Sequence, residues 1–70
     1  MIITLTKFNS SKKMTFRVDL INLSLSRKIL KKNTGFESKG ITGTELYYDK
    51  QIIEVNESIE RIGNMINDIV

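Results

Sequence analysis

The sequence of 70 residues contains no cysteine, histidine, proline or tryptophan, and these absences exclude several classes of protein. Without cysteine and histidine the chain has no disulfide bond, no thiol nucleophile, no imidazole base and none of the usual zinc ligand sets. No apolar run approaches the roughly 20 residues that cross a bilayer. The first residues lack the basic start and the small-residue cleavage site of a secretory signal. We therefore expect a cytoplasmic protein without a membrane segment.

The length allows one small domain, residues 1–70, with a small core. A chain of this size buries only about 60% of the surface that its unfolded form exposes. Composition excludes disulfide bonds and cysteine- or histidine-bound metals as reinforcement, which leaves good packing or self-association. The length therefore predicts a homo-oligomer, with a marginally stable monomer as the alternative.

Charge is distributed unevenly along the chain. Residues 1–39 contain nine Lys and Arg and two acidic residues, whereas residues 40–70 contain two Lys and Arg and six acidic residues. Two halves of opposite charge can attract each other within one subunit or between subunits. The alternative is that both are ordinary solvated faces.

Two patterns at the start of the chain predict a β-hairpin. Residues 2–8 are rich in β-branched and aromatic types, and residues 9–12 are turn formers. From Met14 to Leu20 apolar and polar residues alternate, which is typical of a half-buried strand. At Leu20 and Ile21 the alternation slips by one residue, so the chain must bend, bulge or turn there. A third strand should then run to about Leu25, with Ile21, Leu23 and Leu25 on one face; the alternative is that it resumes at Ile29 and Leu30.

The middle of the chain changes character. Residues 31–43 are polar, contain three of the four glycines and show no period, so we predict a long, mobile loop there. Residues 44–48 and 51–55 alternate on either side of Asp49 and Lys50, which predicts a second hairpin with a tight link.

The end of the chain follows a helical period. Isoleucines recur at three- and four-residue spacing from Ile59 to Ile69, which predicts an amphipathic helix over residues 57–69. Asn56 is a good N-cap, and Glu57 would lie in the first turn and pair with Arg61. Gly63 is unfavourable within a helix, so we expect it to mark a close packing contact.

The sequence offers little equipment for catalysis. A nucleophilic serine would need a base, and only lysines or scattered carboxylates are present. The glycine spacing at Gly35 and Gly40 is that of a phosphate-binding loop, but Ile41 stands where that loop requires lysine. We therefore predict no enzymatic activity, no catalytic residue, no cofactor and no metal site.

Basic and aromatic side chains are the candidates for binding. Exposed hairpin edges and the 31–43 segment would bring together residues able to contact a protein partner or an anionic ligand such as a nucleotide or nucleic acid. These residues are Arg17, Arg27, Lys28, Lys31, Lys32, Phe36 and Tyr47.

Three segments of the sequence resemble the small flagellar and swarming-motility proteins of the FlbD-like family. They are the start Met1-Ile-Ile-Thr-Leu-Thr-Lys-Phe-Asn9, the central Val18-Asp-Leu-Ile21 and the segment from Ile53 to Ile62, which reads Ile-Glu-Val-Asn-Glu-Ser-Ile-Glu-Arg-Ile. The similarity covers both ends, whereas Ser10 replaces the usual glycine and residues 31–43 replace a compact turn. It implies a regulatory adaptor, bacterial or encoded by a phage, and brings no catalytic residues.

Together these observations predict an α+β fold, in which a small bent antiparallel sheet of two hairpins and a middle strand packs against one C-terminal helix. They predict a non-enzymatic, self-associating regulatory protein that binds a protein partner. One alternative is a phage-type inhibitor of a host defence system, which binds a host protein or sequesters a nucleotide signal between subunits. Another is a basic nucleic-acid-binding module.

Overall fold

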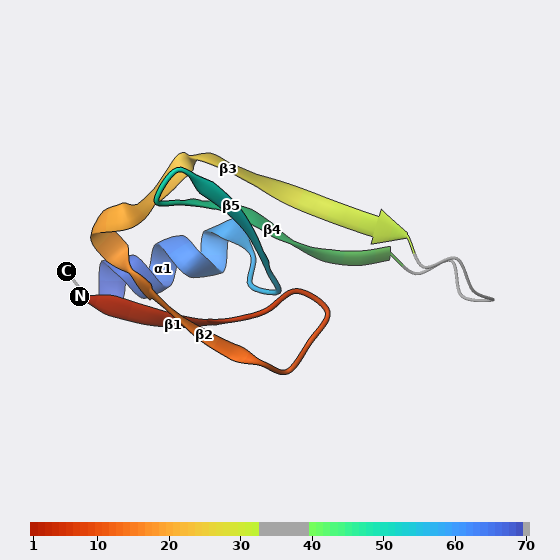
Figure 1. Cartoon of the computed structure of the whole chain (residues 1–70), viewed down its shortest axis with the longest axis horizontal. Helices are drawn as coiled ribbons and strands as arrows, with labels where there is room; N and C mark the ends of the chain where they lie inside the picture. Colours follow the sequence, from red (N-terminus) through yellow and green to blue (C-terminus); the bar gives the residue numbers. More distant parts are fainter. Residues whose placement is uncertain (33–39, 70) are drawn as a thin grey trace.

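The computed structural model describes residues 1–32 and 40–69, and it confirms the predicted α+β class (Figure 1). Strands β1 and β2 form one antiparallel hairpin, and β3, β4 and β5 form a three-stranded antiparallel sheet in that order. One helix follows the last strand. The elements are β1 (Ile2–Thr6), β2 (Lys13–Arg17), the 3-10 turn η1 (Val18–Leu20), β3 (Ile21–Lys32), β4 (Gly40–Tyr48), β5 (Gln51–Val55) and α1 (Ile59–Ile69).

The two sheets meet where β1 ends beside the end of β5. The Phe8 amide donates to the Glu54 carbonyl at 3.1 Å, and the Asn56 amide donates to the Thr6 carbonyl at 2.9 Å. Between β2 and β3, η1 turns the chain at the position where the alternation of the sequence slips, which confirms the predicted bend. These hydrogen bonds and an isolated bridge between Lys7 and Val55 join the two sheets at this point.

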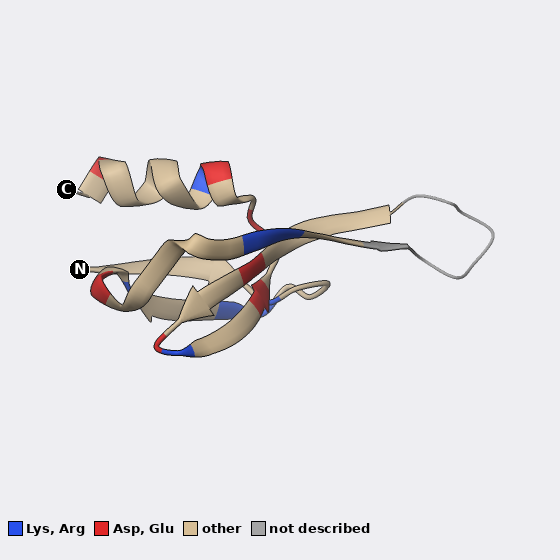
Figure 2. Ribbon diagram, turned by 90° about the horizontal axis from the view of Figure 1, so that it is seen from above, with Lys and Arg blue, Asp and Glu red and all other residues tan. Residues whose placement is uncertain are grey.

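Helix α1 lies along one side of the strands (Figure 2). Its Ile62 is fully buried, and Met65 and Ile66 pack beside it. Because Leu46 and Val55 of the three-stranded sheet are also fully buried, the helix and strands share one apolar core. The buried residues of that core are Ile3, Leu5, Phe16, Leu46, Val55 and Ile62.

A polar contact fixes the segment that leads into the helix. The Glu57 carboxylate accepts hydrogen bonds from the Thr6 amide at 2.9 and 3.1 Å and from the Thr6 hydroxyl at 2.9 Å. The Thr44 hydroxyl donates to the Glu57 carbonyl at 2.7 Å. Both threonines are buried, and a buried hydroxyl needs such partners. Glu57 thus joins β1 and β4 to the start of the helix.

This contact corrects the predicted start of the helix. Helix α1 begins at Ile59, and the Ser58 hydroxyl accepts a hydrogen bond from the Arg61 amide at 3.1 Å, so Ser58 and not Asn56 is the N-cap. Glu57 precedes the helix and bonds to Thr6 instead of pairing with Arg61.

The two predicted hairpins are confirmed. Asp49 and Lys50 link β4 to β5 with positive φ angles of 47° and 63°. Two successive residues in this region form the type I′ turn, whose twist matches that of antiparallel strands. At the other hairpin, β1 pairs with β2 from Ile2 opposite Arg17 to Thr6 opposite Lys13.

The loop predicted over residues 31–43 is wrong at both ends. β3 continues to Lys32 and β4 begins at Gly40, with these two residues opposite each other in register. Backbone pairing across the hairpin compensates for the weak periodicity of its sequence. The β3–β4 pair therefore extends beyond the helix as an arm (Figure 1). Residues 33–39, the centre of the predicted loop, lie outside the described residues.

Two glycines differ from their predicted roles. Gly43 lies within β4 instead of a turn, and a Cβ there would collide with the Val55 carbonyl oxygen and the Phe8 ring. At Gly63 of α1, a Cβ would meet only Leu23, at an ordinary contact distance of 3.8 Å. The close packing that requires glycine is therefore at Gly43 and not in the helix.

Candidate functional site

The three-stranded sheet has a second face, which the helix does not cover. Side chains of cross-strand neighbours lie on the same face of a sheet, so Arg27 shares this face with Glu45, and Tyr47 shares it with Ile52. A shallow hollow of about 310 Å³ opens between these four residues and Leu25. We call this surface the outer face.

Two large aliphatic side chains border the hollow and are exposed. Leu25 is 55% exposed and Ile52 is 63% exposed. Tyr47 lies half-buried between them. An isolated exposed aliphatic residue is common, whereas two beside an aromatic ring and a charged pair are typical of an interaction surface.

An irregularity in β3 places Leu25 on the outer face. Asn22 lies opposite Tyr47 and Arg27 lies opposite Glu45, so β3 contains three more residues than β4 between these pairs. The Asn22 side chain holds this bulge by accepting hydrogen bonds from the Ser24 hydroxyl at 2.6 Å and the Leu25 amide at 3.3 Å. The predicted sharing of one face by Ile21, Leu23 and Leu25 is therefore wrong for Leu25, because a bulge changes the face of the residues that follow.

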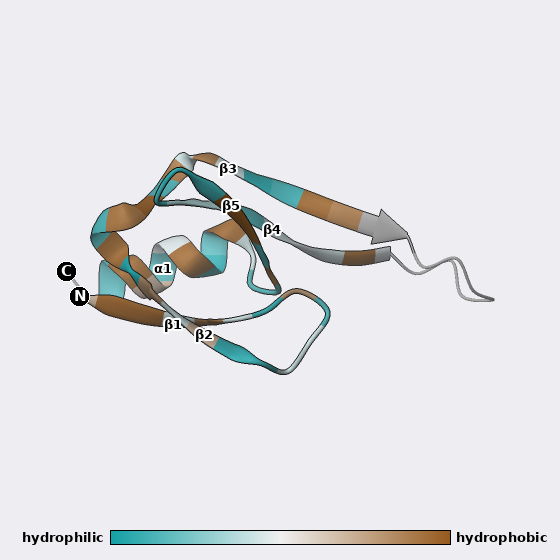
Figure 3. Cartoon of the chain, in the orientation of Figure 1, coloured by the Kyte–Doolittle hydropathy of each residue, from teal (hydrophilic) through white to brown (hydrophobic). Residues whose placement is uncertain are grey.

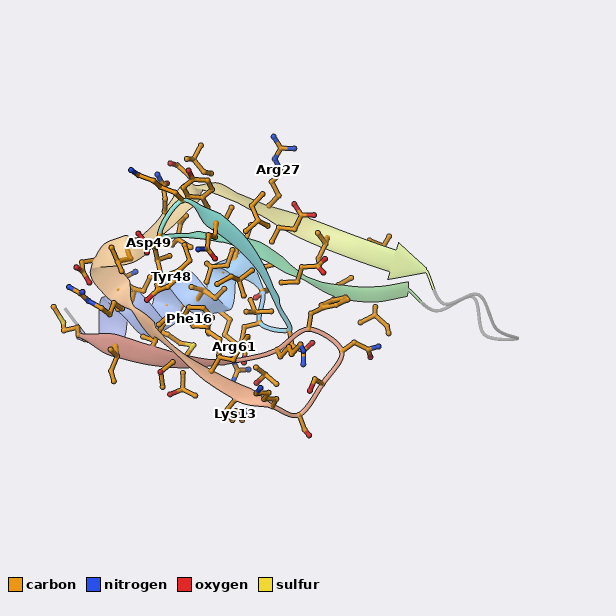
Figure 4. The ribbon with its side chains drawn as sticks, in the orientation of Figure 1. Lys13, Phe16, Arg27, Tyr48, Asp49 and Arg61 are labelled. Atoms are coloured by element: carbon orange, nitrogen blue, oxygen red, sulfur yellow. The ribbon has the colours of Figure 1, made fainter. Side chains whose placement is uncertain are left out.

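The charges of the outer face lie in a row across the sheet. Glu45 on β4 lies opposite Arg27 on β3 and opposite Glu54 on β5. Arg27 projects away from the body of the molecule (Figure 4). Arg17 and Asp19 form an ion pair at 2.8 Å, which lies at the end of β2 and not on this face. Arg27 and Glu45 are thus neighbours on this face, with Arg27 exposed and Glu45 half-buried.

Among the predicted binding residues whose side chains the structure describes, Arg27 and Tyr47 come together. Arg17 lies at the end of β2, where its side chain binds Asp19 and its amide donates to the Tyr48 hydroxyl at 3.0 Å. Lys28 points to the other face of the sheet, opposite Thr44. Lys31 and Lys32 belong to the end of β3, and Phe36 lies outside the described residues.

The sequence interpretation missed Leu25, Glu45 and Ile52. The adjacent pair Ile52 and Ile53 contained a signal, because two neighbours in a strand point to opposite faces and one of them must leave the core. Leu25 offered no such signal, since its position depends on the bulge. Glu45 gave no signal of a binding role, because it lies in a strand whose polar and apolar residues alternate in the usual way.

Lys28 borders a separate hollow of about 300 Å³ near the start of α1. Two of its polar neighbours are already engaged: the Asn56 side-chain oxygen Oδ1 accepts from the Asn9 amide at 2.7 Å, and Ser58 caps the helix. Glu60 adds a negative charge at the rim. Among the described residues that line this hollow, Lys28 is therefore the one positively charged side chain, and the hollow offers an anion few other binding groups.

Neither a metal site nor a membrane-spanning helix is found among the described residues. Residues 1–32 and 40–69 contain no group of three acidic side chains that could hold a metal ion. No helix in that part of the chain is long and apolar enough to cross a membrane. Comparison with known proteins finds no matching family model, curated protein or solved structure.

Proposed function

We propose that this chain is a non-enzymatic regulatory protein that associates with itself through the outer face and also binds a protein partner. The observation that carries the proposal is the exposure of Leu25 and Ile52 on a sheet face that the helix leaves uncovered. Burying such side chains in an interface stabilises it by about 25 cal/mol per Å² of apolar surface. The resemblance to FlbD-like proteins supports the same proposal, which includes a cytoplasmic location.

The charges of the outer face suit contact between two copies. A two-fold axis through the hollow would bring Arg27 of one copy beside Glu45 of the other, and the same contact would repeat on the opposite side of the axis. Such reciprocal pairs favour one orientation of the two copies. The small core gives a second reason, since only seven of the described hydrophobic residues are buried.

The test compares two isoleucines of equal exposure. Ile52 is 63% exposed on the outer face, and Ile2 is 62% exposed on β1, away from it. We expect Ile52→Thr to weaken self-association by about 10-fold or more, because two copies each lose an apolar contact, and Ile2→Thr to leave it unchanged. Sedimentation velocity over a range of protein concentrations measures both. Equal behaviour of the two variants would refute the outer face as the contact surface.

A further inference from the structure

The free edge of β3 is a second surface that could accept a partner. β3 is the outermost strand of its sheet and pairs only with β4. Its regular part runs from Arg27, opposite Glu45, to Lys32, opposite Gly40. An edge strand presents unpaired N–H and C=O groups on its outer side, where another chain can add as a further strand.

Hydrogen bonds of β4 and β5 determine which backbone groups of β3 face outward. The Tyr47 amide donates to the Ser26 hydroxyl at 3.0 Å, so Tyr47 directs its backbone groups toward β3. Backbone direction alternates along a strand, so Glu45 also faces β3, and its partner Arg27 faces β4. Lys28 and Leu30 therefore direct their N–H and C=O groups to the free edge. The outward carbonyl of Glu54 on β5, which accepts from Phe8, follows the same alternation.

The other outer strand is protected. β2 has five residues, and the Tyr48 hydroxyl occupies the outward amide of Arg17 at 3.0 Å. In contrast, β3 has twelve residues, and its end projects with β4 beyond the helix. The chain has no proline to interrupt this edge. Of the two outer strands, β3 is therefore the open one.

Charge and hydropathy at this edge indicate the kind of strand that fits. Residues 27–32 read Arg-Lys-Ile-Leu-Lys-Lys, and β4 supplies one acidic residue, Glu45, opposite them. The basic band on β3 is visible in Figure 2, and an apolar stretch follows it in Figure 3. Leu30 of that stretch is 59% exposed. A strand with acidic and apolar residues would complement both features.

Two other occupants fit less well. The same edge of a second copy would place lysines and arginine opposite lysines and arginine, and like charges directly opposite each other destabilise a pair of strands. A single-stranded nucleic acid would need aromatic rings on which its bases stack, and residues 27–30 provide none. The backbone groups of the edge would also be unused by a nucleic acid.

We infer that an acidic, extended segment of the partner protein adds to β3 as a further strand, held by the backbone groups of Lys28 and Leu30 and by the charge of Lys28. The inference rests on the proposed function in one respect, that the partner is a protein. It adds the chemistry of the segment and the place where it binds. It assigns the edge to the partner and leaves the outer face to self-association.

The test uses a short, end-blocked, fluorescent peptide of alternating glutamate and valine, with binding measured by fluorescence anisotropy at low salt. We expect a peptide that is N-methylated at every residue to bind at least about 10-fold more weakly, because neither of its edges can donate hydrogen bonds to β3. A peptide with lysine in place of glutamate should also lose binding. If the N-methylated peptide binds as well as its parent, the inference is wrong.

Variants at Lys28 separate the charge from the backbone hydrogen bond. Lys28→Gln removes only the charge, and we expect it to weaken binding by about 2-fold to 3-fold. Lys28→Pro also removes the outward N–H without removing a hydrogen bond to β4, and should weaken binding by a further 10-fold or so. Lys12→Gln, at an exposed turn, is the control and should change nothing. Circular dichroism establishes that each variant is folded, and the N-methylated peptide tests the same point if Lys28→Pro does not fold.

A single-stranded oligothymidylate supplies the alternative outcome. If it binds more tightly than the acidic peptide, and Lys28→Gln and Lys28→Pro weaken it equally, the edge is a nucleic-acid surface and the inference is wrong. Sedimentation of the Lys28 variants distinguishes this failure from that of the proposed function. If the protein still self-associates but binds no peptide, the inference about the β3 edge is wrong and the proposed self-association is unaffected.

Discussion

The two faces of the three-stranded sheet differ in what covers them. On one face Thr44, Leu46 and Val55 are fully buried beneath the helix, and Glu57 satisfies the polar group among them. On the other face Leu25 and Ile52 are more than half exposed. An antiparallel sheet with one solvated face usually has polar side chains there. The comparison shows that one face builds the fold, while the other keeps apolar surface that folding does not use.

The largest expected difference between the faces is in stability. Leu46→Ala removes a fully buried side chain and should lower the free energy of unfolding by about 2–5 kcal/mol. Ile52→Ala removes an exposed side chain and should change it by about 0.5 kcal/mol or less when the protein is monomeric. Urea denaturation at low protein concentration measures both. A large loss from Ile52→Ala under those conditions would mean that the outer face belongs to the core.

Alanine substitutions at Gly43 and Gly63 should change the stability of the protein in opposite directions. Gly43→Ala should destabilise the protein by about 1–3 kcal/mol, because the added Cβ collides with a backbone oxygen that cannot move freely. Gly63→Ala has room for its Cβ and should stabilise the helix by up to about 1 kcal/mol. Thermal unfolding of both variants tests this pair, and a tolerated alanine at Gly43 would show that Phe8 does not pack where the structure places it.

The smallest effect is expected at the turn between β4 and β5. Lys50 has a φ of 63°, which side chains other than glycine adopt at a cost. Lys50→Gly should stabilise the protein by about 0.5–1 kcal/mol, because glycine adopts this angle freely. The change touches neither face, so calorimetry should show a higher melting temperature while sedimentation shows unchanged self-association. Altered association would indicate that the turn belongs to the contact surface.

Sequence patterns predicted the elements that depend on neighbours in the chain. The alternation before and after Asp49 and Lys50 fixes that hairpin, and the isoleucine spacing fixes the helix. Features that depend on distant residues were not predictable. Glu57 reads as a first-turn carboxylate, but its partner Thr6 lies far away in the sequence and becomes adjacent only after folding.

The candidate site shows the same limit. Arg27 and Tyr47 were predicted because basic and aromatic side chains are common in binding surfaces. Their neighbour Leu25 was not, because three extra residues in β3 change its face, and the alternation of residues 21–26 conceals them. Lys28 was grouped with Arg27, although adjacent residues of a strand point to opposite faces. The structure thus divides one predicted basic cluster between two surfaces.

The molar mass of the wild-type protein as a function of concentration tests the central claim most directly. The outer face predicts that light scattering will give a mass that rises from 8.1 kDa toward at least twice that value between about 10 μM and about 1 mM. A mass that stays at 8.1 kDa over the whole range would contradict self-association through the outer face.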